Sequence, residues 1–390
     1  MPHIATELAR RHAEQRYRRR EVMDGPQGVE ARVGGETLLA FCSNDYLGLA
    51  NHPAVVAAFK AGADRYGVGA GASHLLGGHS AAHHALEEEL AAFVGCERAL
   101  LFSTGYMANL GVVTALTDRH ATLFEDKLNH ASLIDAARLS QAKVRRYAHA
   151  DIGGLQTMLA GADGEILIMS DGVFSMDGDI APLPALIALA EKSGARLLID
   201  DAHGLGVLGK GGRGTFEHYG IVPRAPAILM GTLGKAFGSF GAFVAGSEEL
   251  IEFLIQQART YIYTTALPPA VAEATRASLR LVQTEPWRRE HLQALVARFR
   301  AGAAAHGLKL LPSNTPIQPL ILGESAQALA ASRQLLARGL LVPAIRPPTV
   351  PAHSARLRIT FSAAHSFEQV DRLLEALATL EVTVEGGLPT

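Results

Sequence analysis

Residues 196–203 read RLLIDDAH, and residues 227–238 read AILMGTLGKAFG. Each stretch begins with a short, continuous apolar run, which is typical of a strand covered on both faces in a parallel sheet. Polar side chains follow each run: Asp200 and His203 after the first, and Thr232 and Lys235 after the second. Because ligands of such sheets bind beyond the carboxyl ends of the strands, these four side chains are predicted to share one site.

Together these groups suit an aldehyde cofactor. A lysine among small residues has room for a carbonyl partner, and lysines form Schiff bases with such compounds, pyridoxal phosphate (PLP) among them. Asp200 at a strand end would keep a pyridine nitrogen protonated, so that the ring accepts electrons. His203 and Thr232 would bond the ring hydroxyl and the phosphate. The alternative for each residue alone is structural, with Asp200 capping a turn and Lys235 solvated.

Composition excludes several other classes of protein. The chain has 390 residues, of which 48% are hydrophobic, so one or two domains with a large core are expected. A net charge of -2 and a pI near 6.8 provide no field suited to nucleic acid or to an acidic membrane. Two cysteines make no disulfide framework. No apolar run reaches membrane-spanning length, and glutamates among the N-terminal arginines argue against a transit peptide, so a cytoplasmic protein is predicted.

Periodicity along the chain predicts an α/β fold. From residue 99 strands alternate with helices, which implies crossover units and a mainly parallel sheet. Beyond about residue 270 long helices are interleaved with few strands, which indicates a smaller α+β domain. We therefore expect an N-terminal helix (4–22) and segment within 1–50, a large cofactor-binding domain at 51–275 and a small C-terminal domain at 276–390.

Further polar groups fall at strand ends or on strands of this pattern. A helix beginning near Met107 follows the strand 99–102, and its N-terminus at Gly105 and Tyr106 favours a phosphate. His130 follows the strand 122–125. In the C-terminal part, Arg358 alternates with apolar residues, so its planar side chain is placed to meet a carboxylate; a surface ion pair is the alternative.

Three other patterns are predicted to carry no nucleotide or metal. Residues 67–72 (GVGAGA) lack the preceding strand of a dinucleotide fingerprint, and residues 204–211 (GLGVLGKG) lack the helix that must follow either nucleotide motif. His79, His83 and Glu87 are spaced four apart, but His79 precedes the helix cap at Ser80 and no second cluster completes a site. No metal site is therefore predicted.

Several short motifs occur along the chain: SNDYLGL (43–49), HAS (130–132), GVFSMDGD (172–179), DDAHG (200–204), TLGK (232–235), RPPTVP (346–351) and RLRIT (356–360). In these motifs the chain resembles the PLP-dependent α-oxoamine synthases, over nearly its whole length. The first several motifs are shared by the wider family, whereas the stretch RPPTVP points to the member that acts in biotin biosynthesis.

This resemblance implies an aminotransferase-like PLP fold of type I, usually a homodimer with its site at the subunit interface. It makes Lys235 the Schiff-base lysine and the base at the substrate α-carbon, pairs Asp200 with the pyridinium nitrogen, and stacks His130 on the ring. The other cofactor-binding residues that it implies are Gly105, Tyr106, Ser175, His203 and Thr232. Its implied substrate-binding residues are Arg18, Asn44, His130, Thr349 and Arg358, with the run from Arg18 to Arg20 permitting a shift of register.

The implied reaction is a decarboxylative condensation of L-alanine with a pimeloyl thioester. Whether the acyl carrier is CoA or a carrier protein stays open. The alternatives are a sibling synthase that joins glycine to acetyl-CoA or serine to a long acyl-CoA, and, more remotely, a non-catalytic PLP-binding partner subunit.

Overall fold

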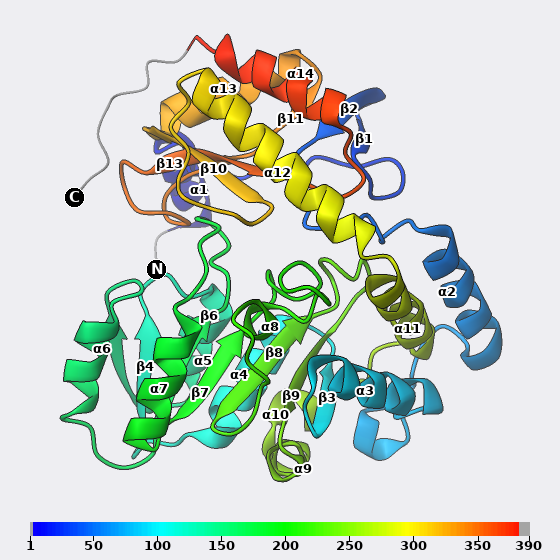
Figure 1. Ribbon diagram of the computed structural model, residues 1–390, viewed down its shortest axis with the longest axis vertical. Helices are drawn as coiled ribbons and strands as arrows, with labels where there is room; N and C mark the ends of the chain where they lie inside the picture. Colours follow the sequence, from blue (N-terminus) through cyan, green and yellow to red (C-terminus); the bar gives the residue numbers. More distant parts are fainter. Residues whose placement is uncertain (1–2, 382–390) are drawn as a thin grey trace. The chain divides into compact units, whose positions relative to one another are not determined.

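A seven-stranded sheet carries the stretches with which the sequence analysis began. In the computed structural model, which describes residues 3–381, the strand order is β3-β9-β8-β7-β6-β4-β5 (Figure 1). Strands β5, β4, β6, β7 and β8 are parallel, and β9 runs antiparallel to both β8 and β3. The bounds are β3 Arg98–Phe102, β4 Thr122–Asp126, β5 Lys143–Tyr147, β6 Ile166–Asp171, β7 Arg196–Asp200, β8 Ala227–Thr232 and β9 Ala242–Gly246. The expected mainly parallel sheet is confirmed.

Strands β7 and β8, which carry these stretches, are buried along nearly their whole length. Leu197, Leu198 and Ile199 of β7 are fully buried, as continuous apolar runs between two layers of helices should be. Two strands escaped the sequence analysis: β5, at the sheet edge, is mostly charged and exposed, and β9 is a short run of small and apolar residues. Edge strands carry little apolar pattern because only part of their surface is covered.

The chain divides into two compact units. The second unit, Leu47–Ser175 with Asp179–Arg289, contains the seven-stranded sheet, and the boundary between the units falls within helix α12. Its helices α4 and α7 pack on the sheet, and α2 packs on α11. The helices are α2 Pro53–Tyr66, η1 His74–Leu76, α3 Ala81–Val94, α4 Gly105–Leu116, α5 Ala131–Leu139, α6 Ile152–Leu159, α7 Leu183–Ser193, α8 Thr215–His218, α9 Glu248–Gln257, α10 Arg259–Ile262 and α11 Pro269–Thr284.

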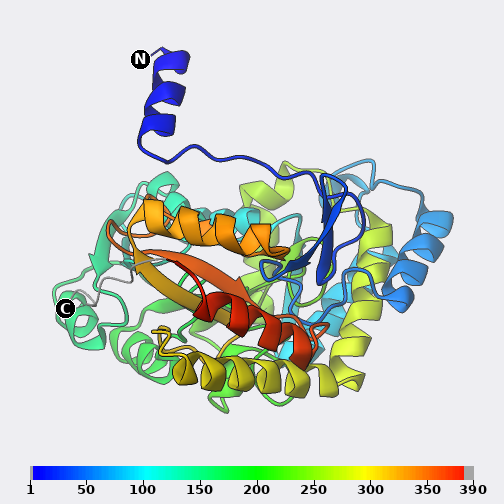
Figure 2. The same cartoon turned by 90° about the horizontal axis from the view of Figure 1, so that it is seen from above.

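The first unit joins the two ends of the chain: the residues up to Tyr46, Met176–Gly178, and the residues from Glu290 onward. Strand β2 pairs with β1 in the expected hairpin and with β11 in parallel, while β13 lies between β10 and β12. In Figure 2 the helices α12, α13 and α14 lie alongside the strands β10 and β13. The elements are α1 Ile4–Ala13, β1 Glu30–Val33, β2 Glu36–Ala40, α12 Trp287–Ala305, β10 Ile317–Gly323, α13 Ser325–Ala337, β11 Leu340–Leu341, β12 Ala344–Ile345, β13 Ala355–Thr360 and α14 Phe367–Ala378.

The N-terminal helix is shorter than predicted. It ends at Ala13 and not at residue 22, because Gln15 takes a positive φ of 56° that interrupts the helical backbone. Glu7 pairs with Arg11 at 2.9 Å, and Glu14 pairs with Arg10 and Arg16. The helix buries none of its residues, and Figure 2 shows it apart from the other elements of its unit.

Other local predictions agree with the structure. Helix α3 begins after the cap at Ser80 and ends at Val94, before Gly95, whose φ of 81° is left-handed. Helix α14 has a capping box between Ser366 and Gln369. Residues 204–211 form turns and not a helix. Within 308–322, β10 is the strand that forms, and Leu310 contributes a single bridge. None of the helices between residues 3 and 381 is long and apolar enough to cross a membrane. Residues 1–2 and 382–390, the ends of the first and last predicted segments, lie outside the described part.

Candidate active site

All eight predicted cofactor-binding residues line one cavity of about 170 Å³ in the second unit. The cavity lies at the carboxyl ends of β6, β7 and β8, where the sequence placed it. Its lining is Gly105, Tyr106, His130, Ser132, Asp171, Val173, Ser175, Asp200, Ala202, His203, Met230, Thr232 and Lys235. The segments that follow β4, β6, β7 and β8, together with the starts of α4 and α5, therefore supply a single set of reactive groups.

Lys235 and His203 meet inside this cavity. Lys235 lies in the turn after β8, and its Nζ is 2.8 Å from His203 Nε2. His203 is buried in the turn after β7. Thr232, the last residue of β8, donates through Oγ1 to the Gly241 carbonyl at 3.1 Å, which closes the loop that carries the lysine. The Lys235 amine thus lies at the carboxyl end of the sheet, among groups that follow the neighbouring strands β7 and β8.

Asp200 is the anionic centre of a buried hydrogen-bond network. Its Oδ1 accepts from the Ala202 N–H at 3.1 Å, and its Oδ2 accepts from Asn109 Nδ2 at 2.7 Å. Asn109 Nδ2 also donates to Ser132 Oγ at 2.8 Å, and Ser132 Oγ is 2.7 Å from His130 Nδ1. The carboxylate and the imidazole are therefore linked through Asn109 and Ser132, so their positions depend on one another.

A second carboxyl group, that of Asp171, accepts a hydrogen bond from the backbone of His130. The backbone N–H of His130 donates to Asp171 Oδ1 at 3.2 Å, and Asp171 is the buried last residue of β6. Burial and the neighbouring Asp200 raise the pKa of Asp171 well above its usual range. Burial also lowers the pKa of His130, although Asp200 opposes this effect. A neutral imidazole over the cavity is the form that stacks on an aromatic ring with least desolvation cost.

The start of helix α4 forms another wall. Thr104 caps this helix by accepting the Met107 N–H through Oγ1 at 3.1 Å, and Gly105 and Tyr106 stand in its first turn. N–H groups of a first helical turn have no partner within the helix, so they face an anion favourably. The Tyr106 hydroxyl donates to Asp135 Oδ2 at 2.5 Å, which holds the ring at this end of α4.

Apart from His130, which lies in the second unit, the predicted substrate residues belong to the first unit, where they form two pairs. Arg358, buried on β13, directs both Nη1 and Nη2 to Asn44 Oδ1 at 3.3 Å, and the Tyr46 hydroxyl donates to the same oxygen at 3.2 Å. Arg18 Nη2 donates to Thr349 Oγ1 at 3.2 Å. Arg18, and not a neighbour in the arginine run, is thus the residue beside Thr349.

Sequence reasoning missed Asn109, Ser132 and Asp171, the residues that connect the predicted groups. Asn109 is a fully buried amide within the otherwise apolar helix α4, and that pattern was the available signal, since polar side chains are buried only where they find partners. Asp171 follows the apolar run of β6 in the same way that Asp200 follows β7.

The donor set fits PLP. A primary amine stands where an aldehyde could react, and a helix start is ready for the phosphate. Asp200, only 5% exposed, already accepts two neutral N–H groups, and a buried carboxylate is best compensated by a cationic partner such as a pyridinium N–H. The fold and this pocket define a PLP-binding protein with the aminotransferase-like architecture.

Comparison with known proteins gives the family. The model of the family "Aminotransferase class I and II" matches residues 36–377, so the chain belongs to this family. It is 64% identical over 376 residues to the 8-amino-7-oxononanoate synthase of Methylococcus capsulatus, covering 96% of this chain and 97% of that relative.

Solved serine palmitoyltransferases have the same fold. The Sphingomonas wittichii enzyme superposes with a TM-score of 0.91 at 34% identity, covering 96% of this chain and 95% of that one. The S. paucimobilis enzyme with bound PLP–myriocin superposes with a TM-score of 0.90 at 30% identity and covers 96% of each chain. The cofactor of this chain is accordingly PLP.

Proposed function

We propose that this protein condenses L-alanine with a pimeloyl thioester, releasing CO₂ and the free thiol carrier and forming 8-amino-7-oxononanoate in biotin biosynthesis. The observation that carries the proposal is the 64% identity, over nearly the whole chain, to a synthase of that name. The cavity that joins Lys235, His203, Asp200 and His130 supplies the chemical groups that such a reaction needs.

PLP, when bound, supplies an electron sink that stabilises negative charge at the α-carbon of an amino acid. Lys235 would hold the cofactor covalently through Nζ and, once displaced by the substrate amine, would take the α-proton at the same atom. His203 Nε2, 2.8 Å from Nζ, is within hydrogen-bond distance of the Lys235 amine and would orient it. Asp200 would keep the pyridine nitrogen protonated.

The first unit contributes the groups for the substrates. Arg358 would bind the carboxylate of L-alanine, because a buried guanidinium held by an amide oxygen is a preformed partner for a planar anion. Arg18 and Thr349 would contact the acyl substrate, and both are exposed, as contact with a large thioester requires. Whether CoA or an acyl carrier protein delivers the pimeloyl group is decided by the assay below. The homodimer and the cytoplasmic location remain predictions.

Thiol release tests the choice of substrates. The PLP-loaded protein is given L-alanine, glycine or L-serine, each with pimeloyl-, acetyl- or palmitoyl-CoA, and a parallel set uses pimeloyl-acyl carrier protein. Preference for L-alanine with either pimeloyl thioester supports the proposal. Preference for serine with palmitoyl-CoA would instead assign the sibling activity named for the two solved relatives, which are less similar at 30–34% identity.

A lysine pair tests the site itself. Lys235→Ala is expected to abolish both covalent attachment of PLP, read from its absorption spectrum, and turnover, because no other group in the cavity is a primary amine. Lys192→Ala, which changes an exposed lysine at the end of α7, is the matched control and should keep both. Full activity in the Lys235→Ala protein would refute the assignment.

A further inference from the structure

A cluster of imidazole and carboxylate groups lies at the start of α3, in the second unit. His74, His79, His84 and Glu87 line a cavity of about 270 Å³. None of the described residues lines both this cavity and the one that contains Lys235. The cluster therefore serves neither cofactor binding nor the proposed chemistry. The sequence spacing singled out only His79, His83 and Glu87. The structure places His74, on η1, and His84, which follows His83 on α3, beside them.

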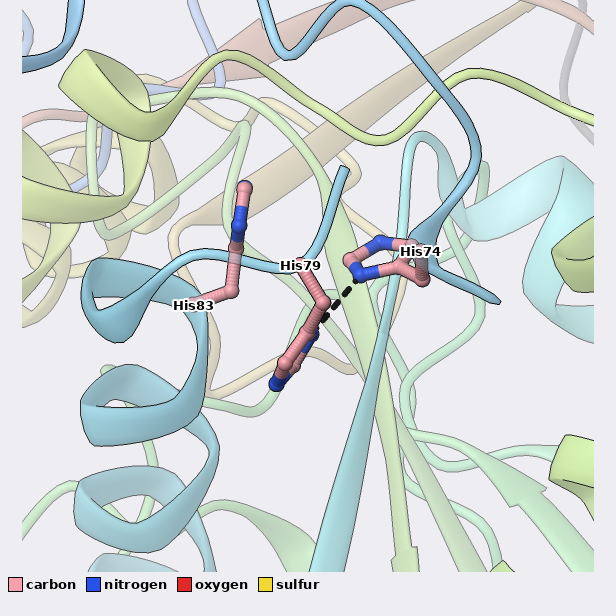
Figure 3. A group of neighbouring side chains, drawn as sticks. All are labelled: His74, His79 and His83. Carbon is pink, nitrogen blue, oxygen red and sulfur yellow. Dashed lines mark hydrogen bonds between the residues drawn. The ribbon is translucent and has the colours of Figure 1, made fainter. Parts of the chain in front are cut away.

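Two sets of three ligands are geometrically available. In each, one ligand atom per residue lies within 4.8 Å of the others: His74 with His79 and His83, and His79 with His84 and Glu87. Figure 3 shows the first set, in which the rings of His74 and His79 are joined through their Nδ1 atoms at 2.9 Å. His79 is common to both sets.

In the first set, both ring nitrogens of His83 already form hydrogen bonds with the protein backbone. His83 Nδ1 accepts the Ser80 N–H at 3.0 Å as part of the α3 capping box, and His83 Nε2 is 2.7 Å from the Leu267 carbonyl. Both nitrogens of this buried ring are thus in use, because Nδ1 accepts and Nε2 donates. A metal there would have to break the helix cap, so the first set is structural.

The second set has its ligand atoms facing the cavity. His79 Nε2 is 3.9 Å from Glu87 Oε2, and the other carboxylate oxygen of Glu87 accepts the Leu101 N–H at 2.9 Å, which fixes the group. His84 lies three residues before Glu87 on α3, so both project from the same face of the helix. The His84 side chain is 66% exposed, and its Nε2 lies 3.5 Å from the exposed Glu88 carboxylate, so the ring has room to turn toward the cavity.

We propose that His79 Nε2, His84 Nε2 and the Glu87 carboxylate bind one Zn²⁺ ion, with a water molecule at the fourth tetrahedral position. Two imidazoles and a carboxylate are an established ligand set for this ion, with bonds of about 2.0–2.2 Å. The ligand atoms would close from their present separations, within 4.8 Å, to about 3.4 Å from one another.

His74 acts as the positioning residue of this site. A histidine that binds metal through one nitrogen donates from the other to a fixed partner, which sets the tautomer. Here His79 Nδ1–H would donate to His74 Nδ1, leaving His79 Nε2 with its lone pair toward the ion. The buried His74 ring is itself held by stacking on Tyr261, with ring centroids 4.8 Å apart.

The ion would also increase the stability of the fold. Glu87 has only 13% of its side chain exposed, so its carboxylate lies largely away from water. A divalent cation compensates this carboxylate and ties the segment before α3 to the helix. The expected consequence is greater thermal stability of the holoenzyme, with little change in turnover.

The experiment uses untagged, PLP-loaded protein, dialysed against a chelator and then titrated with Zn²⁺. We expect one ion per chain at micromolar concentration, measured by metal analysis after equilibrium dialysis, and a higher Tm in Zn²⁺. His84→Ala, an exposed helical substitution that does not threaten folding, and Glu87→Gln, which keeps the acceptor for Leu101, should each weaken Zn²⁺ binding by at least about tenfold and remove the Tm shift.

His306→Ala, which changes an exposed histidine elsewhere, is the matched control and should bind Zn²⁺ as the unmodified protein does. Failure of the unmodified protein to bind Zn²⁺ at micromolar concentration would overturn the proposal. Equal binding by His84→Ala and His306→Ala would overturn it as well, because the ion would then lie elsewhere.

Discussion

His149 connects the end of a sheet strand to the loop that brings Ser175 to the cofactor cavity. Its Nδ1 is 3.1 Å from Asp126 Oδ1, at the end of β4, and its Nε2 is 2.8 Å from Asp179 Oδ2. Burial lowers the pKa of His149, but the hydrogen bonds and charges of Asp126 and Asp179 outweigh it and raise the pKa to about 10. The perturbation that tests this bridge is His149→Ala.

The magnitude follows from proton linkage. Between an unfolded pKa near 6.5 and a folded pKa of about 10, the folded protein holds one more proton than the unfolded chain, so stability is fully present below pH 6.5 and is lost as pH rises toward 10. One proton corresponds to about 1.4 kcal/mol per pH unit, or roughly 2.7 kcal/mol between pH 7 and pH 9. Since 28% of the side chain is exposed, solvent screening reduces this to about 1.5 kcal/mol.

Thermal unfolding of the PLP-loaded protein at pH 7 and pH 9 measures the effect. The unmodified protein should lose roughly 2 °C more in Tm than His149→Ala over this interval, since about 1 kcal/mol corresponds to roughly 1.2 °C at an unfolding entropy of about 2.1 cal/mol/K per residue. His306→Ala, a surface change, should keep the full pH dependence. The variant should also bind PLP more weakly at pH 7, because Asp179 no longer anchors the loop that carries Ser175. Parallel pH dependence in the unmodified protein and His149→Ala would refute the reasoning.

Three further substitutions probe the site and the sheet. Arg358→Ala should raise the KM for L-alanine at least about tenfold while Arg358→Lys loses less, because a charge-assisted hydrogen bond contributes about 1.5–3 kcal/mol; an unchanged KM would remove the residue from carboxylate binding. Asp200→Asn should lower kcat by about 100-fold with PLP still bound, since the volume stays and the charge is lost; wild-type kcat would contradict the assigned role. Gly231→Ala would place a Cβ 2.7 Å from Leu205 and 2.8 Å from Phe243, so calorimetry should show destabilisation of about 1–3 kcal/mol, and an unchanged Tm would contradict it.

The local parts of the site could be read from the sequence because each depends on neighbouring residues. An apolar run followed by Asp200 or by Lys235 identifies a buried strand and the group at its carboxyl end, and parallel packing brings such ends together. The cap at Ser80 and the left-handed Gly95 bounded α3 for the same local reason.

Tertiary structure decided what depends on partners distant in sequence. Asn44 and Arg358 are 314 residues apart, and only the pairing of both chain ends in one unit makes the amide oxygen a partner of the guanidinium. The buried amide of Asn109 is explained by its hydrogen bonds to Asp200 and Ser132, which belong to other elements. In the same way, His74 on η1 becomes a partner of His79 only in the folded chain. Periodicity reports which face of an element is covered, whereas a hydrogen bond or a ligand set depends on which other element covers it.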